Sequence, residues 1–197
     1  MLAESFICVL LFAVLLFQFD SGWASVVDGG VLNAFSDGSF LAVFRFLGSE
    51  LVLSGGAVLL IVFLFWKRNI AGITAVLIGL GGGNLLNKAL KEWVARERPP
   101  FPHGEDGFSF VSGHAMVGMT FYLLLAYFIQ FCEDRTVLFY TFALLLAFLS
   151  GMSRIAGSAH YATDVLAGWL LGGGIFLSIA FFLNERPRRQ TTRKSYR

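Results

Sequence analysis

The chain has 197 residues, of which 56% are hydrophobic and 14% are charged, and its formal net charge is +2. Its mean hydropathy is +0.71, and a single soluble core cannot bury so much apolar surface. The composition therefore excludes an ordinary soluble domain and indicates that lipid covers most of the surface.

Six apolar segments without a charged side chain predict membrane-spanning helices. Each has about 15 to 20 residues, the length that crosses about 30 Å of hydrocarbon. They are Ser5–Phe19, Leu51–Trp66, Ile70–Asn87, Ala115–Cys132, Thr136–Ser153 and Val165–Leu183. No linker or low-complexity tract divides the sequence. We therefore expect one domain over residues 1–197 with an all-α fold, an integral membrane bundle of six transmembrane helices.

The first segment could also be a cleaved signal peptide, because Trp23-Ala24-Ser25 faintly resembles a processing site. Its leading stretch holds Glu4 and no Lys or Arg, whereas a signal peptide begins with positive charge. We therefore expect this helix to be retained.

Between the first two spans, residues 26–48 mix apolar side chains irregularly with three charged ones. The charged residues are Asp28, Asp37 and Arg45. This pattern predicts a short interfacial helical segment, broken at Gly29-Gly30 and at Gly38.

Two glycine runs, Gly81 to Gly83 and Gly172 to Gly174, lie inside apolar spans. Neither run ends in the Lys-Ser/Thr pair of a nucleotide-binding loop. Small residues let transmembrane helices approach closely, so both runs predict close helix packing.

The distribution of positive charge predicts the orientation, because Lys and Arg near helix ends are retained in the cytoplasm. Lys67, Arg68 and Arg135 lie in two short loops that share a side with the tail, residues 184–197, if the helices alternate. The tail carries Arg186, Arg188, Arg189, Arg193, Lys194 and Arg197. Both termini are therefore expected in the cytoplasm, with the tail against anionic headgroups rather than nucleic acid.

Ionisable side chains gather at helix ends on the opposite side, and such costly positions indicate function. Lys91 and Arg98 follow the third span two helical turns apart, so both are expected on one side of a helix. Pro99 and Pro100 are expected to end that helix. Cations at a helix end can also simply snorkel to the interface, and this cluster alone leaves both interpretations open.

The second cluster stands at the entrance of the fourth span. Ser112 and Gly113 can offer backbone N–H groups and a helix dipole to an anion, with His114 beside them. An ordinary serine cap with an incidental histidine would look the same.

The third cluster, Ser153 to Asp164, connects the last two spans. His160 and Asp164 stand four residues apart. In a helical turn the carboxylate can therefore accept from one imidazole nitrogen and leave the other as a nucleophile. Arg154 offers a planar fork for phosphate oxygens. A capped helix start is the alternative, but three such clusters on one side together favour a phosphate site.

The three clusters resemble the signature motifs of the type 2 phosphatidic acid phosphatase family. Those motifs are Lys, six residues, Arg-Pro; then Pro-Ser-Gly-His; then Ser-Arg, five residues, His, three residues, Asp. Lys91 to Pro99 fits the first and Ser153 to Asp164 fits the third. The second departs at Val111, where the family usually has proline, which questions only the rigidity of that loop. The resemblance covers about residues 70–183, and bacterial integral members also have six spans.

The resemblance implies a role for each of these side chains. His160 would attack phosphorus, Asp164 would orient its imidazole, and His114 would protonate the leaving oxygen. The phosphoryl oxygens would be held by Lys91, Arg98, Ser112, Gly113 and Arg154. No Asp or Glu cluster has metal-ligand spacing, so no metal or other cofactor is expected. The role of the nearby loop residues His103, Glu105 and Asp106 stays open.

These features predict a phosphatase of the bacterial inner membrane with an extracytoplasmic site. It would act through a phosphohistidine on a lipid phosphomonoester such as phosphatidylglycerophosphate or phosphatidic acid, and undecaprenyl pyrophosphate phosphatase is the alternative. Vanadium haloperoxidases share the motifs but are soluble, and a transporter or scaffold would not need both histidines. The expected partners are the lipid phosphate and membrane lipids, with no nucleic acid and no obligate protein partner.

Overall fold

The computed structural model describes residues 1–35, 40–130 and 135–194, with side chains as far as Glu185. The break predicted at Gly38 and the basic side chains of the tail fall outside this description. In chain order the helices are α1 (Leu2–Gln18), α2 (Gly22–Phe35), η1 (Phe40–Gly48), α3 (Glu50–Trp66), α4 (Ile70–Val76), η2 (Leu77–Gly82), α5 (Gly83–Val94), α6 (Gly113–Ile129), α7 (Thr136–Ala156) and α8 (Ala162–Lys194). All regular structure in the described ranges is helical, as predicted.

The predicted apolar segments are helical where the chain is described, except that the first helix ends at Gln18, one residue before Phe19. By length and composition three helices can cross a membrane alone: the continuous run Ile70–Val94, α7, and α8 as far as Glu185. Two bent pairs, α1 with α2 and η1 with α3, would raise the number to five, and α6 is a shorter apolar helix of 17 residues. The chain is an integral membrane protein, and the count of six spans stays a prediction.

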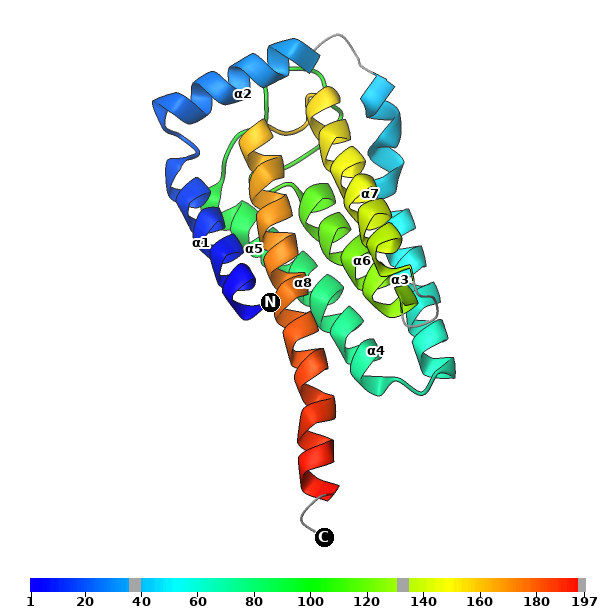
Figure 1. Cartoon of the computed structure of the whole chain (residues 1–197). Coiled ribbons are helices and arrows are strands. Elements are labelled where there is room, and N and C mark those ends of the chain that lie inside the picture. Colours follow the sequence, from blue (N-terminus) through cyan, green and yellow to red (C-terminus); the bar gives the residue numbers. More distant parts are fainter. Residues whose placement is uncertain (36–39, 131–134, 195–197) are drawn as a thin grey trace.

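α6 packs against both α7 and α8 inside the bundle (Figure 1). It is apolar around most of its circumference and largely buried, as expected of a helix enclosed by others. A Cβ on Gly168 of α8 would lie 2.9 Å from the carbonyl oxygen of Ser112, and one on Gly172 would collide with the carbonyl oxygen of Met116. The prediction of close helix packing is therefore confirmed at Gly172.

Two other glycine predictions are wrong. Close helix packing is not found at Gly81 or Gly82, because a Cβ added to either residue would have no neighbour within 4 Å. Both residues lie in the π-helical turn η2. Gly29 and Gly30, the expected break, lie inside α2, which continues to Phe35. A glycine costs a helix only about 1 kcal/mol relative to alanine, which contacts made elsewhere along the helix can offset.

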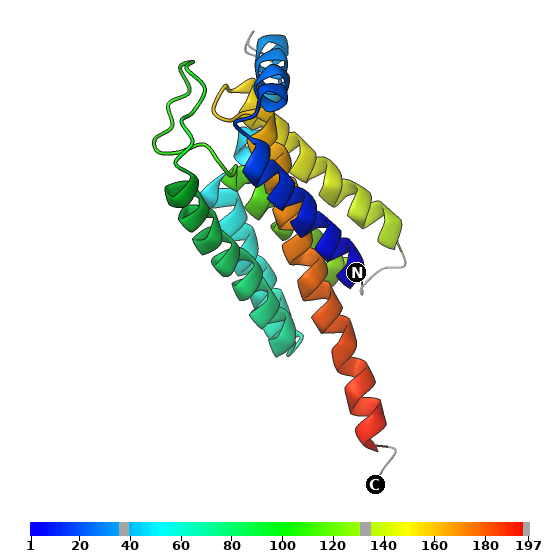
Figure 2. The same cartoon turned by 90° about the vertical axis from the view of Figure 1, so that its left-hand side faces the viewer.

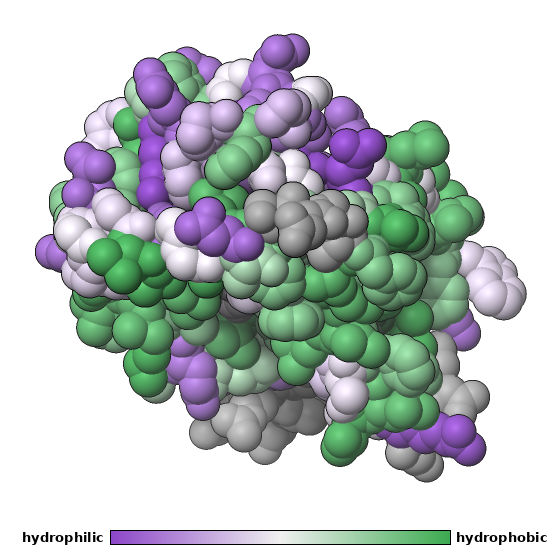
Figure 3. All heavy atoms as spheres, turned by 90° about the horizontal axis from the view of Figure 1, so that it is seen from above, coloured by the Kyte–Doolittle hydropathy of each residue, from purple (hydrophilic) through white to green (hydrophobic). Residues whose placement is uncertain are grey.

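The polar connections share one end of the bundle. α2 bends by 94° from α1 and lies across this end (Figure 1). The loop 95–112 and the connection from α7 to α8 reach the same end (Figure 2). Seen from above, hydrophilic residues gather over one part of this face and hydrophobic residues border them (Figure 3). The turn from α3 to α4, with Lys67 and Arg68, lies at the opposite end.

Candidate active site

The first motif begins in the last turn of α5 and ends in the loop that follows it, so the motif is not one continuous helix. α5 ends at Val94, and Ala95 takes a left-handed conformation with φ 50° while its N–H donates to the carbonyl of Lys91. The predicted helix end at Pro99 is therefore wrong. Lys91 lies in the last turn of α5 and Arg98 in the following loop. A left-handed residue at a helix end turns the chain away from the axis, so the two cations do not share one helix face.

The second motif begins α6, with Ser112 as the N-cap residue. Its N–H donates to the carbonyl of Asp164 over 3.2 Å, which joins the second motif to the third. Val111, in the place of the usual proline, is fully buried, and its carbonyl accepts from Nδ2 of Asn87 over 3.0 Å. Packing of the Val111 side chain and this hydrogen bond therefore restrict the loop, as the ring of the usual proline would.

The third motif runs from the end of α7 to the first turn of α8. The carbonyl of Arg154 accepts from the N–H groups of Ala159 (3.0 Å) and His160 (3.3 Å), which closes the connection into a tight loop. The Arg154 side chain is buried, and its Nη2 lies 2.8 Å from Oε1 of Glu105. Glu105, whose role the sequence left open, thus pairs with a predicted phosphate ligand.

The charge of Glu105 depends on this contact. Partial burial acts to raise the pKa of the carboxyl, but the hydrogen bond and charge of Arg154, with the charge of Arg98, hold that pKa below its ordinary value. Glu105 is therefore ionised at neutral pH and lies on the guanidinium that is expected to bind phosphate.

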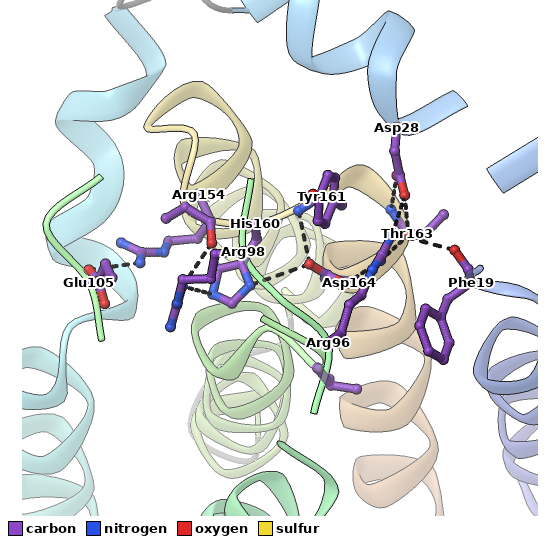
Figure 4. A network of polar contacts seen from close by, with 12 residues as sticks. Phe19, Asp28, Arg96, Arg98, Glu105, Arg154, His160, Tyr161, Thr163 and Asp164 are labelled. Atoms are coloured by element: carbon purple, nitrogen blue, oxygen red, sulfur yellow. Dashed lines mark hydrogen bonds and ion pairs between the residues drawn. The ribbon is translucent and has the colours of Figure 1, made fainter. Parts of the chain in front are cut away.

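The imidazole of His160 is buried between a carboxylate and a guanidinium (Figure 4). Nδ1 faces Oδ2 of Asp164 over 3.6 Å, slightly longer than a hydrogen bond, and Nε2 lies 3.3 Å from Nη1 of Arg98. A guanidinium only donates, so this contact assigns the lone pair to Nε2 and the proton to Nδ1. In this tautomer Nε2 is the nitrogen that can act as a nucleophile.

The protonation state of His160 follows from its surroundings. The pKa of the imidazole is lowered to about 4, chiefly by burial, and the nearby carboxylate of Asp164 acts in the opposite direction. The charges of Arg154 and Arg98 act in the same direction as burial. At pH 7 the ring is neutral, the state in which Nε2 can attack an electrophile.

Arg98 is held in place by three carbonyl oxygens. They belong to Asp106 (3.1 Å), Gly107 (2.9 Å) and Ala159 (2.7 Å). Lys91 interacts electrostatically with Arg98 and Arg154, and His114 with Arg154 and His160. The structure thus gathers all the predicted site residues at one end of the bundle: Lys91, Arg98, Ser112, Gly113, His114, Arg154, His160 and Asp164.

Several polar atoms at this end are buried without a hydrogen-bond partner among the described residues. Besides Oγ of Ser109, they are Oγ of Ser112, Nε of Arg154 and Nδ1 of His160. Buried polar groups normally find a partner within the protein. Those of Ser112 and Arg154 are donors for which an oxyanion is a suitable acceptor.

The sequence interpretation missed two residues beside this pair, the half-buried Arg96 and the buried Asp28. Nη1 of Arg96 lies 2.6 Å from Oδ1 of Asp164, and Nη2 lies 2.8 Å from Oδ2 of Asp28. Asp28 is 68 residues from Arg96 along the chain, so no local spacing connects them. The available signal was an acidic residue in an otherwise apolar interfacial stretch, which favours a paired or functional carboxylate.

The structure is an apolar helical bundle of the membrane-protein class, and the His–Asp pair among clustered cations at one end has the chemistry to bind an anion. Residues 72–188 match the model of the PAP2 superfamily. The chain belongs to this family, and the resemblance inferred from the three motifs is confirmed.

One known sequence and two solved structures are similar to the chain. The chain is 38% identical over 132 residues to phosphatidylglycerophosphatase B of Bacillus subtilis (strain 168), and this match spans 64% of each chain, just under two thirds of the relative. It matches the crystal structure of the first transmembrane PAP2 type phosphatidylglycerolphosphate phosphatase from Bacillus subtilis with a TM-score of 0.85, 28% identity, and coverage of 92% of this chain and 96% of that one. Aquifex aeolicus LpxE, with a TM-score of 0.57, 22% identity and coverage of 87% and 93%, is similar in fold.

Proposed function

We propose that the protein is a membrane lipid phosphatase that transfers a phosphoryl group from its substrate to His160 and then to water. The observation that carries the proposal is the buried imidazole of His160, whose Nε2 lies 3.3 Å from Nη1 of Arg98 and whose Nδ1 faces Asp164. Membership of the PAP2 superfamily and the similarity to phosphatidylglycerophosphatase B support this reaction class.

In the first step the lone pair of Nε2 attacks phosphorus, and a P–N bond forms as the P–O bond to the lipid breaks. The imidazole keeps its proton on Nδ1 and becomes a cation, whose charge the Asp164 carboxylate balances. His114 gives a proton to the departing oxygen. The products are a phosphohistidine and a dephosphorylated lipid.

In the second step water attacks the phosphohistidine while His114 takes a proton from it. The P–N bond breaks, its electron pair returns to Nε2 of His160, and inorganic phosphate leaves. The phosphoryl oxygens would be held throughout by Lys91, Arg98, Ser112, the Gly113 N–H and Arg154. Binding of the substrate phosphate would therefore displace Glu105 from Arg154.

A groove of about 460 Å³ between α3, η2 and α6 supports a lipid substrate. His114 and Glu50 line it at the site end, and apolar side chains such as Ala57, Ile61 and Leu80 line it deeper in the bundle. A phosphate ester bound beside His114 could place an acyl chain in this groove. We propose phosphatidylglycerophosphate as the substrate, with phosphatidic acid as a second phosphomonoester.

We further propose that the reaction needs no metal ion. Lys91, Arg98 and Arg154 supply the positive charge that a divalent cation gives in other phosphoryl transfers. Among the residues that the structure describes, no three His, Cys, Asp or Glu side chains form a group that could hold a metal.

Phosphate release from a panel of purified lipids in detergent tests these proposals. We expect turnover of phosphatidylglycerophosphate and phosphatidic acid, and unchanged turnover in excess EDTA. Turnover of undecaprenyl pyrophosphate alone would transfer the assignment to that substrate. Loss of activity in EDTA that Mg²⁺ restores would refute the metal-free mechanism, and no release from any member of the panel would refute the phosphatase.

A further inference from the structure

Arg96 links the His160–Asp164 pair to a helix that contributes no residue to the three motifs. It follows the end of α5, and its side chain is 12% exposed. Its Nη1 lies 2.6 Å from Oδ1 of Asp164 and 2.8 Å from Oγ1 of Thr163, and its Nη2 lies 2.8 Å from Oδ2 of Asp28 (Figure 4). One guanidinium fork therefore joins two buried carboxylates from different helices.

Two aromatic rings fix the plane of this guanidinium. The Cζ atom of Arg96 lies 4.1 Å from the ring centre of Tyr161 and 5.1 Å from that of Phe19. Cation–π contacts and hydrogen bonds both depend on orientation, and each Nη atom of Arg96 is held by a different carboxylate, so the guanidinium has little freedom to rotate away from Asp164.

Asp28 brings α2 into the same network. Its Oδ1 accepts from the N–H of Thr163 over 2.9 Å, and its Oδ2 accepts from the Thr163 hydroxyl over 2.7 Å. Thr163 lies in the first turn of α8, so a carboxylate from another helix caps the helix that carries Asp164. α2 is thereby attached to the start of α8, one residue from the partner of His160.

The contacts of Asp164 show how this affects His160. Oδ1 faces Arg96, while Oδ2 accepts from the Tyr161 N–H over 2.9 Å and lies 3.6 Å from Nδ1 of His160. Both oxygens of the Asp164 carboxylate are thus held by neighbouring groups, which fixes the orientation of the carboxylate. Without Asp28, the charge of Arg96 would be uncompensated and would repel a cationic imidazole at His160.

We propose that Arg96 and Asp28 are positioning residues for the catalytic pair: Arg96 fixes the Asp164 carboxylate, and Asp28 fixes Arg96 and shares its charge. The proposal rests on the proposed function, because its effect reaches the substrate through His160. Charge then alternates along the row His160, Asp164, Arg96 and Asp28 when the phosphohistidine cation forms.

Steady-state kinetics of Arg96→Gln and Asp28→Asn on the lipid phosphate that the wild type turns over test the proposal. Arg96→Gln should lower kcat about 10- to 100-fold, the cost typical of removing an outer hydrogen-bonding partner from an active-site group. The inhibition constant of inorganic phosphate, which reports on the cations that hold phosphate, should change by less than about twofold. In an Asp164→Asn background, Arg96→Gln should add little, because it acts through that carboxylate.

Asp28→Asn keeps an acceptor for the Thr163 N–H and should lower kcat about tenfold with the same inhibition constant. It decides the question alone if Arg96→Gln does not fold. Asp20→Asn, an exposed acid at the same end, is the matched control and should be unchanged. The proposal would be overturned if either Arg96→Gln or Asp28→Asn kept the wild-type kcat. It would also be overturned if phosphate affinity fell by the same factor as kcat. Wild-type protein that releases no phosphate from any lipid would refute the proposed function, and this inference with it.

Discussion

The guanidinium of Arg154 pairs with a carboxylate at the position where the proposed mechanism requires a phosphate. Nη2 of this buried guanidinium pairs with Glu105, which is 31% exposed and lies on the loop before α6. A partly exposed acid can leave such a pair at low cost, since ion pairs in contact with water contribute about 1 kcal/mol or less. Glu105 would thus keep the guanidinium paired until a stronger anion arrives.

Glu105→Gln should therefore tighten the binding of phosphate. The competing charge is lost, so the inhibition constant of inorganic phosphate should fall roughly three- to tenfold, equivalent to about 1 kcal/mol. Product inhibition of the lipid reaction measures it. Asp106→Asn removes the same charge from the neighbouring exposed residue and serves as the control. If phosphate binding became weaker in Glu105→Gln but not in Asp106→Asn, Glu105 would orient Arg154 rather than compete with phosphate for it.

The two histidines should respond differently to removal. His160→Ala should abolish turnover and the covalent phosphoenzyme, because Nε2 of His160 is the proposed nucleophile. His114→Ala should lose about 10²- to 10⁴-fold on a lipid ester, the usual contribution of a general acid, and much less on an aryl phosphate whose leaving group needs little protonation. Rapid-quench trapping of acid-labile phosphate on the protein compares the two variants. Phosphoenzyme in His160→Ala, together with its absence in His114→Ala, would show that the roles are reversed.

At the scale of the elements, the sequence predicted helices well and their ends less well. The length of an apolar run follows from the thickness of the membrane, and each of the six predicted segments contains a helix over nearly all of its described residues. The end of α5 was placed at Pro99 because proline is the strongest local signal, yet the chain turns at Ala95, a residue with no such signal. The ion pair of Asp28 and Arg96 could not be predicted from local sequence either, because only the tertiary fold brings these two residues together.

The end of η1 determines where His114 can lie. A Cβ on Gly48 would lie 2.6 Å from Cδ2 and 2.8 Å from Cβ of His114, and it would also collide with Oγ of Ser150. Because Cβ of His114 is attached to the backbone of α6, the ring cannot avoid this contact by rotation alone. The packing of η1 therefore fixes the proposed acid.

Gly48→Ala should consequently impair catalysis through His114. A displacement near 1 Å can cost about 10²-fold, so kcat on the lipid substrate should fall about 10- to 100-fold. Activity on an aryl phosphate should fall less, because its leaving group needs little acid assistance. Gly55→Ala, on α3 with nothing within 4 Å of the added Cβ, is the matched control. Equal losses on both substrates would mean that the substitution disturbs more than His114.

At the scale of the whole molecule, the cations at the two ends differ in what they contact. At the site end, Arg96 pairs with two buried carboxylates and Arg154 pairs with Glu105. Lys67 and Arg68, at the opposite end, are exposed at the turn from α3 to α4. Cations that are paired inside the fold are held by those contacts, so we infer the topology from the exposed ones. We propose on this basis that the site end is extracytoplasmic in a bacterial inner membrane, with both termini in the cytoplasm.

Cysteine labelling in intact cells tests this orientation. In a background with Cys8→Ser and Cys132→Ser, Pro102→Cys places a thiol on the exposed loop at the site end, and Ser195→Cys places one in the basic tail. A membrane-impermeant maleimide added outside should label the first and leave the second unlabelled until the cells are opened. Both variants should retain phosphatase activity, because neither position belongs to the proposed site. Labelling of the tail alone in intact cells would place the site, and its lipid substrate, on the cytoplasmic face.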